Sequence, residues 1–373
     1  MSNLLTDCAR HMAESHGKNW STKPRKLVKG GTINELGRDR EAIANMLWHS
    51  THTNWFEYNA GSRLIHFRFP KQYRKEARDG VRPFFEKAGP TTQRGQPTID
   101  NPVMRVKVME KIKKVIKRRY LTMASGATIK SYIKYFAVPK GEDDIWMVYD
   151  ATANKLNDAV WAPSCWLLTI DTLVRNVGRD SWMTDRDVGD MFLNYQLHED
   201  VRPYTGVDLS CLYTSPEDPG PRCALCDRNL MGFAASPYNS IKMALVAEEV
   251  CKGNRLETGV GIDMKELNPF LWKTISLNLP GTKEYDPRVS WIYKRREDGQ
   301  MACDVLTFVD DERVVGPTEE LTWQASHVLA SKQSYLGIQD AARKARPCSQ
   351  TTGAWAGAIV HVVEQLGVCV LTS

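Results

Sequence analysis

Two groups of acidic residues, far apart in the chain, each follow an apolar run typical of a β-strand. In "SWMTDRDVGDMF", Asp187 and Asp190 come after "WM", and in "LTFVDDERVV", Asp310 and Asp311 come after "LTFV". Aspartate is a common turn former, so the second group alone is compatible with a simple turn. If the two strands are neighbours in one sheet, however, Asp187 and Asp310 meet at one edge and share a site.

Carboxylates brought that close repel each other and raise each other's pKa unless a cation lies between them. Hard divalent cations, above all Mg²⁺, prefer oxygen ligands, and two ions about 3.5 to 4 Å apart stabilise both oxygens of a phosphoryl displacement. Zinc is disfavoured, because no His or Cys set lies beside the acids. The lone "CALC" (Cys223, Cys226) lacks a second pair nearby, which favours a structural role. The acids are therefore predicted to be magnesium ligands.

Basic residues are concentrated between residues 101 and 134. The chain has 373 residues and a net charge of +6, whereas this segment alone has ten Lys and Arg against one acid. In it, Met104, Val108, Ile112 and Val115 follow three- and four-residue steps, which predicts an amphipathic helix that begins near Pro102. The basic side of this helix fits a phosphate backbone, through counterion release, or a merely solvated face.

The length allows two or more lobes with a large core. Nine cysteines at irregular spacings and the absence of a basic, then apolar, leader favour a reduced intracellular protein, with nucleus and cytoplasm not distinguished. The late stretch "GAWAGAIVHVVEQLGVCVL" is interrupted by His361, Glu364 and Gln365. It predicts strands rather than a membrane span of about 20 apolar residues.

Local patterns predict several further elements. "IKYFAVPK" and "IWMVYD" flank "GEDD", which indicates a β-hairpin with Lys140 near its tip. "CWLLTIDTLVRNVG" is typical of a helix ended by Gly178, and "GFAASPYNSIKMALVAEEV" of a Ser-Pro turn that opens a helix. Strands joined at Asp298-Gly299 precede "FVDD", and Thr318 precedes a helical pattern with an imperfect capping box.

Taken in order, these segments resemble reverse transcriptases. "DVGDMFLNYQL", "GFAASPYN" and "FVDD" look like the three central palm motifs. The basic helix, "FAVPKG", "MVYD" and "KLND" resemble the fingers, and "LLTIDTLV" is similar to the helix before the first palm motif. "LGIQDAARKARP" looks like the lysine motif and "GAWAGAIVHV" like the primer grip. The resemblance covers roughly residues 101–370, and the order of the segments makes it specific.

The resemblance implies an α+β, right-hand polymerase fold with fingers and a palm whose antiparallel sheet is backed by helices. The helical thumb is expected to be absent, so a partner that supplies a thumb or other retroelement domains is one alternative. The expected domains are an N-terminal extension of unknown role (residues 1–100), the fingers (101–160), a first palm part (161–198), a fingers–palm connection (199–228) and a second palm part (229–373). The second palm part is expected to contain an insertion at about 252–300.

Roles for individual residues follow from the resemblance alone. Asp187 and Asp310 would ligate two Mg²⁺ ions, or Mn²⁺, with help from the Val188 carbonyl and Asp311. For Asp311, turn geometry is the alternative. Lys344 would donate a proton to the leaving pyrophosphate.

Other implied roles concern the nucleotide and the primer. Phe192 would be the steric gate against a ribose 2′-hydroxyl, although a buried strand Phe fits the local pattern equally well. Trp355 and Gly357 would position the primer end, with a core tryptophan as the alternative. The remaining nucleotide-binding positions, some of them equally compatible with surface side chains, are Lys140, Trp146, Val188, Asp190, Gly232 and Lys344.

The sequence departs from the pattern of the family at several positions. Trp146 stands four residues before Asp150, where an arginine usually grips the triphosphate, and a tryptophan supplies no charge. Met231 replaces a glutamine before Gly232, and Glu312 replaces an apolar residue. These departures weaken the expected affinity for nucleotides.

The sequence therefore predicts an RNA-directed DNA polymerase of a retroelement that uses dNTPs, an RNA template and a DNA or RNA primer, without a membrane partner. A degenerate or domesticated copy that binds nucleic acid without synthesis is the main alternative. An RNA-dependent RNA polymerase would need a smaller or polar gate than Phe192, and a two-metal nuclease would not require "GFAASP".

Overall fold

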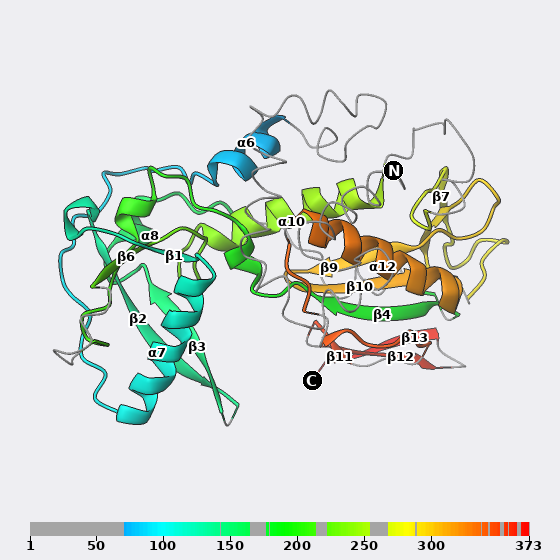
Figure 1. The fold of residues 1–373 in the computed structure, drawn as a ribbon. Helices are drawn as coiled ribbons and strands as arrows, with labels where there is room; N and C mark the ends of the chain where they lie inside the picture. The colour runs from blue at the N-terminus through cyan, green and yellow to red at the C-terminus, as the bar shows by residue number, and fades with distance from the viewer. Residues whose placement is uncertain are drawn as a thin grey trace, which may run out of the picture.

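The protein has two lobes joined along a long helix (Figure 1). The computed structural model describes residues 71–141, 143–164, 177–178, 180–213, 222–253, 268–287, 289–336, 338–341, 344–350, 354–356, 358–363 and 367–372. The helix predicted over "CWLLTIDTLVRNVG" lies almost wholly outside these residues. No helix among the described residues is both long enough and apolar enough to span a membrane.

The first lobe contains a five-stranded mixed sheet in the order β1-β6-β5-β2-β3, and its residues come from the ranges expected for the fingers, the N-terminal extension and the fingers–palm connection. β2 and β5 are parallel, and the other pairs are antiparallel. Its elements and the short helices around them are α6 (Lys71–Asp79), α7 (Pro102–Lys117), β1 (Leu121–Met123), η2 (Gly126–Thr128), β2 (Tyr132–Lys140), β3 (Asp144–Asp150), α8 (Leu156–Ala159), η4 (Arg202–Tyr204), β5 (Gly206–Asp208) and β6 (Cys223–Cys226).

Helix α7 forms as the apolar spacing predicted. The Asn101 side chain accepts hydrogen bonds from the Val103 and Met104 N–H groups, which caps the first turn. Val108 and Ile112 are fully buried, and Met104 and Val115 pack against the same core. The basic residues are consequently left on the other sides of the helix.

The β2–β3 hairpin is confirmed, with Lys140 opposite Asp144 at its tip. Side chains alternate across the strands. Tyr135, Ile145 and Tyr149 are buried on the inner face. On the outer face Trp146 is exposed, so this side of the hairpin offers an aromatic surface to its surroundings.

The second lobe is built on an antiparallel sheet in the order β4-β10-β9, which we call the palm sheet because its strands fall within the residue ranges expected for a palm. Helices α10 and α12 cover one face and contact each other, and the C-terminal sheet β11-β12-β13 lies on the other side (Figure 1). The elements are β4 (Trp182–Asp187), η3 (Met191–Asn194), α10 (Ser236–Lys252), β9 (Asp304–Phe308), β10 (Asp311–Gly316), α12 (Glu319–Tyr335), β11 (Ala354–Trp355), β12 (Ala358–Val363) and β13 (Gly367–Thr372).

Helices α10 and α12 begin at the turns that the sequence predicted. Pro237 is in the first turn of α10, where its missing N–H costs nothing. The Thr318 hydroxyl accepts a hydrogen bond from the Leu321 N–H at the start of α12. The expected C-terminal strands are also present, as the sheet β11-β12-β13.

Part of the range expected to be an insertion forms a separate hairpin of β7 (Thr274–Leu277) and β8 (Ile292–Arg295). A tight turn follows β8, in which the Arg296 N–H donates to the Gln300 carbonyl and Gly299 has a φ of +80°. Asp298-Gly299 is therefore a turn, as predicted. The strand that precedes this turn, β8, forms its ladder with β7.

One apolar core joins the lobes. Tyr149 of β3, Met191 after β4 and Ile241 of α10 belong to the same buried cluster. The fingers hairpin is thus fixed relative to the palm sheet by shared packing, which places the candidate site at their junction.

Candidate active site at the edge of the palm sheet

The two acidic groups meet where β4 and β10 pair. Asp187 at the end of β4 is directly opposite Asp311 at the start of β10. One residue beyond, the Val188 N–H donates to the Asp310 carbonyl at 2.7 Å. The convergence of strand ends that the sequence predicted is therefore present, whereas the binding of metal by these carboxylates stays a prediction.

A two-residue turn presents Asp310 to the site. Phe308 pairs with Asp311, so only Val309 and Asp310 connect β9 to β10. Val309 has a φ of +57°, a conformation that costs a β-branched residue about 1 to 3 kcal/mol. Strain of this kind persists where surrounding contacts determine the backbone, and no local pattern in the sequence indicated it.

Glu312, the third acid, does not face the site. Neighbouring side chains on a strand point to opposite faces, so Glu312 points away from Asp311. It is buried beneath α12, where it accepts a hydrogen bond from Gln333. Burial raises the pKa of Glu312 to about 7, although the nearby Arg186 opposes this shift. Glu312, which stands where the sequence pattern led us to expect an apolar residue, thus belongs to a buried hydrogen-bond network and not to the carboxylate cluster.

The carboxylates of the site repel each other in the protein. Burial, and then the charges of Asp310 and Asp187, raise the pKa of Asp311 to about 6. Burial also raises the pKa of Asp187, and Asp310 and Asp340 add to the shift while a hydrogen bond from Lys344 opposes it. The site therefore favours any cation that comes between these groups.

Lys344 supplies one such cation. Its Nζ donates a hydrogen bond to Oδ2 of Asp187, and the two side chains are 52% and 7% exposed. The segment that carries Lys344 is fixed along β4, because the Ala341 N–H donates to the Asp187 carbonyl and the Gly189 N–H donates to the Gln339 carbonyl. The predicted proton donor thus lies at the predicted metal ligand.

A buried ion pair supports β4 and β10 behind the carboxylates. Arg313 donates to both oxygens of Asp185, with Nε–Oδ1 and Nη2–Oδ2 distances of 2.6 and 3.0 Å. Arg186, on the opposite face of β4, binds Asp340 at 3.2 Å. Breaking a buried pair by removing one partner is strongly destabilising, so these contacts help to fix the register that aligns Asp187 with Asp311.

The donor set suits Mg²⁺ rather than zinc. The backbones of Asp187, Asp310 and Asp311 are brought together at this edge, and no hydrogen bond to the Val188 carbonyl is found among the described residues. Their carboxylates and this carbonyl are all hard oxygen donors. Within the described part of the chain, no three His, Cys, Asp or Glu side chains are already arranged to hold an ion. The chemistry of the donors therefore fits, but an ion at Asp187 has to compete with Lys344.

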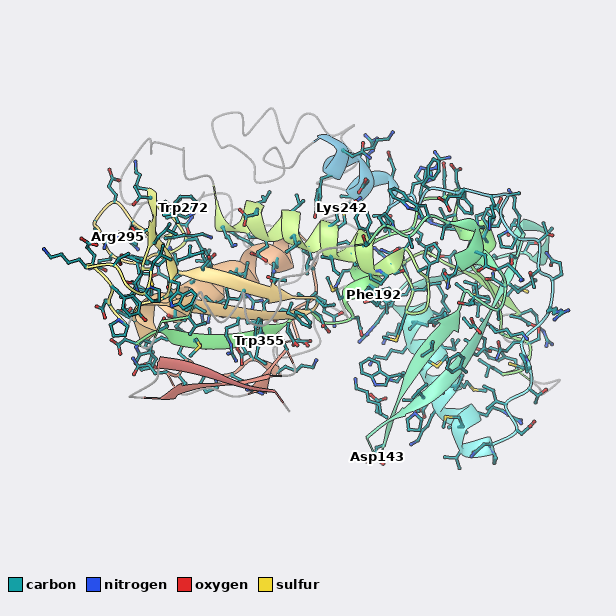
Figure 2. All side chains as sticks on the ribbon, turned by 180° about the vertical axis from the view of Figure 1, so that it is seen from behind. Asp143, Phe192, Lys242, Trp272, Arg295 and Trp355 are labelled. Atoms are coloured by element: carbon teal, nitrogen blue, oxygen red, sulfur yellow. The ribbon has the colours of Figure 1, made fainter. Side chains whose placement is uncertain are left out.

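The fingers hairpin brings Lys140 and Trp146 together. The Lys140 Nζ lies 3.7 Å from the centre of the Trp146 ring, and 44% of Trp146 is exposed. This cation–π contact orients the lysine near the hairpin tip, which the label of Asp143 marks in Figure 2. The Trp146 side chain itself is uncharged, as the sequence indicated.

Phe192 and Asp190 lie in the turn that follows β4. Phe192 is in the short helix η3, is partly exposed and lies at the junction of the two lobes (Figure 2). The alternative of a buried strand Phe is therefore wrong, because the residue is neither in a strand nor buried. Asp190 has a φ of +48°, and its Oδ2 accepts a hydrogen bond from Arg118 Nη1 at 3.1 Å.

Gly232 is the point at which the second palm motif contacts the fingers. Its φ is +100°, and a Cβ on it would lie 2.1 Å from the Tyr149 carbonyl oxygen of β3. Asn157 also donates to the Gly232 carbonyl and accepts from the Ala234 N–H, at 3.0 and 2.8 Å. Only glycine fits here without moving the hairpin.

Trp355 is a core residue in the structure. Only 5% of it is exposed, it packs in a cluster with Met183 and Val315, and the Arg313 guanidinium lies 5.0 Å from its ring centre. This burial favours the alternative that the sequence left open, because the side chain has almost no surface to offer a primer. Gly357 lies outside the described residues.

The two cysteines of "CALC" occupy the ends of β6. Cys226 is fully buried, and burial raises the pKa of its thiol far above the usual value. Cys223 lies 3.4 Å from the Tyr132 hydroxyl. A buried thiol with a raised pKa is a poor metal ligand, which agrees with the structural role expected from sequence.

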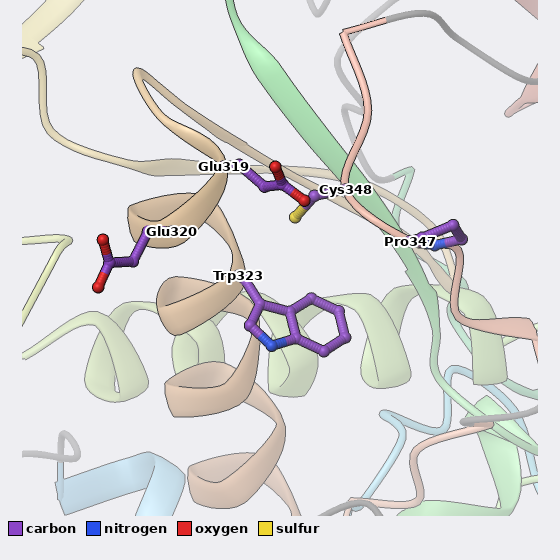
Figure 3. A pocket seen from close by; sticks show the side chains of 5 residues that line it. All are labelled: Glu319, Glu320, Trp323, Pro347 and Cys348. Atoms are coloured by element: carbon purple, nitrogen blue, oxygen red, sulfur yellow. The ribbon is translucent and has the colours of Figure 1, made fainter.

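A pocket of about 420 Å³ lies at the other end of the palm sheet (Figure 3). It is lined by Glu319, Glu320 and Trp323 of α12 with Pro347 and Cys348. β10 runs from Asp311 to Gly316 before α12 begins, so the helix residues that line the pocket follow the end of β10 opposite to Asp311, and none of the five lining residues belongs to the carboxylate cluster. It is separate from the candidate site.

The fold is similar to that of a solved polymerase. A structure of the foamy viral protease-reverse transcriptase dRH in complex with double-stranded DNA matches with a TM-score of 0.51 and 12% identity, over 79% of this chain and 44% of that chain. In sequence, no family model matches and no curated protein matches. The chain spans less than half the length of that viral protein, and at this identity the likeness concerns the fold. The protein therefore has a mixed α/β, reverse-transcriptase-like fold.

Proposed function

We propose that the protein is an RNA-directed DNA polymerase, which transfers a nucleotidyl group from a dNTP to the 3′-hydroxyl of a primer. The observation that carries this proposal is the pairing of Asp187 with Asp311 at the sheet edge, next to Asp310. The reverse-transcriptase-like fold supports it, because a related fold holds nucleic acid in the foamy viral structure. RNA template, DNA or RNA primer and dNTP are the proposed partners.

Asp187, Asp310, Asp311 and the Val188 carbonyl are proposed to hold two Mg²⁺ ions, with Mn²⁺ as an alternative. When bound, the ions supply positive charge that acidifies the primer hydroxyl and stabilises the triphosphate. Lys344, which donates a hydrogen bond to Asp187, is proposed to give a proton to the leaving pyrophosphate once it is released from that carboxylate. Phe192 is proposed to exclude a ribose 2′-hydroxyl from the same site.

A protein that binds nucleic acid without synthesis is the second candidate. Two observations favour it, namely the Lys344 ammonium bound to Asp187 and the uncharged Trp146 at the hairpin. The first competes with metal, and the second removes a contact to the triphosphate.

Primer extension decides between the two. The chain is incubated with an RNA template, a labelled DNA primer, dNTPs and Mg²⁺, beside Asp310→Asn, in which one oxygen donor becomes an amide. Extension by the natural chain and its loss in the variant support the polymerase. Nucleic-acid binding in both proteins, with extension in neither, supports the second candidate.

A further inference from the structure

Three cations form one stripe along α7. Lys111, Lys114 and Arg118 are spaced by three and four residues, so they lie on one side of the helix, away from the buried Val108 and Ile112. From the first to the last, the helix rises by only about 10 Å. We call these three residues the α7 stripe.

Each end of the α7 stripe binds an acid of a different lobe. Lys111 Nζ lies 2.7 Å from Oδ1 of Asp144, at the tip of the fingers hairpin. Arg118 Nη1 lies 3.1 Å from Oδ2 of Asp190, in the turn after β4. The α7 stripe therefore runs from the hairpin tip to the turn that follows Asp187 and carries Asp190.

Positive charge is in excess along the α7 stripe. Lys114 lies between Lys111 and Arg118 on the helix, and no hydrogen bond or ion pair of its ammonium is found among the described residues. Partial burial, followed by the charges of Arg118 and Lys111, lowers the pKa of Lys114. A bound anion would relieve this repulsion, as a phosphate group does among clustered cations.

Arg118 is the member best suited to bind phosphate next to the carboxylates. It caps the C-terminus of α7, and its side chain is only 17% exposed, which holds it in place. Its hydrogen bond to Asp190 uses Nη1, and no other hydrogen bond of this guanidinium is found within the described residues. The other donors of the planar fork are thus available for bidentate contact with phosphate oxygens.

The distance to the carboxylates fits a nucleotide. Residues 187 and 190 are three apart, so their Cα atoms are at most about 11 Å from each other. We infer that Arg118, oriented by Asp190, binds the triphosphate of the incoming nucleotide. This inference rests on the proposed function, and it assigns to α7 a contact that Trp146 of the hairpin does not make.

The test measures nucleotide binding without catalysis. The full chain is bound to an RNA template and a dideoxy-terminated DNA primer with Mg²⁺, and the complementary dNTP is titrated by calorimetry. Arg118→Met removes the guanidinium and keeps the length of the side chain, and Arg118→Lys keeps the charge without the fork. Arg82→Met is the matched control, because Arg82 also pairs with one aspartate, Asp200, at 2.8 Å on the surface.

We expect Arg118→Met to weaken dNTP binding about tenfold or more, and Arg118→Lys to weaken it less, since hydrogen bonds to charged groups are the strong ones. Binding of the primer–template, followed by anisotropy, should change less than about twofold, and Arg82→Met should match the natural chain in both. Circular dichroism verifies that the variants are folded.

Three results would overturn the inference: no dNTP binding by the natural chain, equal dNTP affinity of Arg118→Met and Arg82→Met, or an equal loss of primer–template affinity. The last result would mean that Arg118 binds strand phosphates. Failure of the proposed function is separate, because it appears as absent extension from an unblocked primer while Arg118→Met still loses dNTP affinity.

Discussion

The Lys344 ammonium is hydrogen-bonded to the Asp187 carboxylate, so one predicted functional group neutralises another. A lysine and a divalent cation at one carboxylate would repel each other and compete for its negative charge, and Oδ2 of Asp187 already accepts a hydrogen bond from Lys344. A metal ion at Asp187 would therefore have to compete with Lys344, and displacement of the ammonium would free it to donate a proton elsewhere.

Lys344→Met should strengthen metal binding and weaken turnover. Removing the ammonium frees Asp187 and makes the cluster more negative, and an ion pair of this partly exposed kind is worth up to about 1 kcal/mol, or about fivefold in affinity. Mn²⁺ affinity, measured by electron paramagnetic resonance, should rise by that factor. Lys155→Met, at a lysine with an exposed partner in Asp158, should leave it unchanged. Weaker Mn²⁺ binding in Lys344→Met would contradict the competition.

The carboxylate cluster should make stability depend on pH. The pKa of Asp311 is raised from an ordinary 3.8 to about 6, so the folded protein binds this proton more tightly than the unfolded chain. Stability from this group is therefore complete below about pH 4 and is lost as the pH rises through 6. Without metal, Asp311→Asn should be more stable than the natural chain at pH 7.5, by on the order of 1 kcal/mol after allowance for solvent screening.

Urea unfolding at pH 4.5 and 7.5 measures this difference. The advantage of Asp311→Asn should shrink at the lower pH, where the natural aspartate is protonated. Mg²⁺ should reverse the order at pH 7.5, because it stabilises only the chain that keeps the carboxylate. An advantage of the same size at both pH values would show that repulsion is not its cause.

Gly232→Ala should be among the most disruptive small substitutions. The new Cβ meets the Tyr149 carbonyl at 2.1 Å and also strains a φ of +100°. Gly281→Ala is the matched control, because Gly281 has a φ of +87° with no atom within 4 Å. We expect about 1 kcal/mol of destabilisation in the control, from the backbone alone, and at least about 2 kcal/mol more for Gly232. Equal melting temperatures of the two variants would show that the contact with β3 is not tight.

The local elements could be predicted from the sequence because their signals are local. The spacing of Val108 and Ile112 indicated α7, and the turn residues between two apolar runs indicated the β2–β3 hairpin. The meeting of Asp187 with Asp310 depended instead on the order of several motifs, since no local pattern specifies which strands pair.

Contacts between distant side chains could not be predicted in this way. Lys344 and Asp187 are 157 residues apart, and Arg118 and Asp190 are 72 apart. Arg118 was visible only as one member of a basic helix, and its position relative to Asp190 follows from how α7 packs. Val309 gave no signal either, because its positive φ is imposed by the two-residue turn and not by its own preference.

Nucleic-acid binding should depend on the exposed basic residues of α7. Lys113 and Lys117 point away from the α7 stripe and are exposed. Their replacement by Glu should reduce the slope of log affinity against log salt by roughly 1 to 2, since each phosphate contact contributes about 0.9. Anisotropy at several salt concentrations measures the slope. The control is Lys273→Glu with Lys283→Glu, an equal charge change just before β7 and between β7 and β8. An equal effect of the two pairs would mean that Lys113 and Lys117 are merely solvated.

Phe192→Ala should relax the choice of sugar if the natural chain extends primers. Phe192 is partly exposed in η3, directly after the turn that carries Asp190, so its ring is available to contact a bound nucleotide. Removing the ring opens space for a 2′-hydroxyl, while the carboxylates and Lys344 are untouched. Incorporation of ribonucleotides relative to deoxynucleotides should rise by at least tenfold, with deoxynucleotide use largely kept. Phe84→Ala, which removes an exposed ring elsewhere on the protein, is the control. If both variants discriminate as the natural chain does, Phe192 packs the junction of the lobes and does not read the sugar.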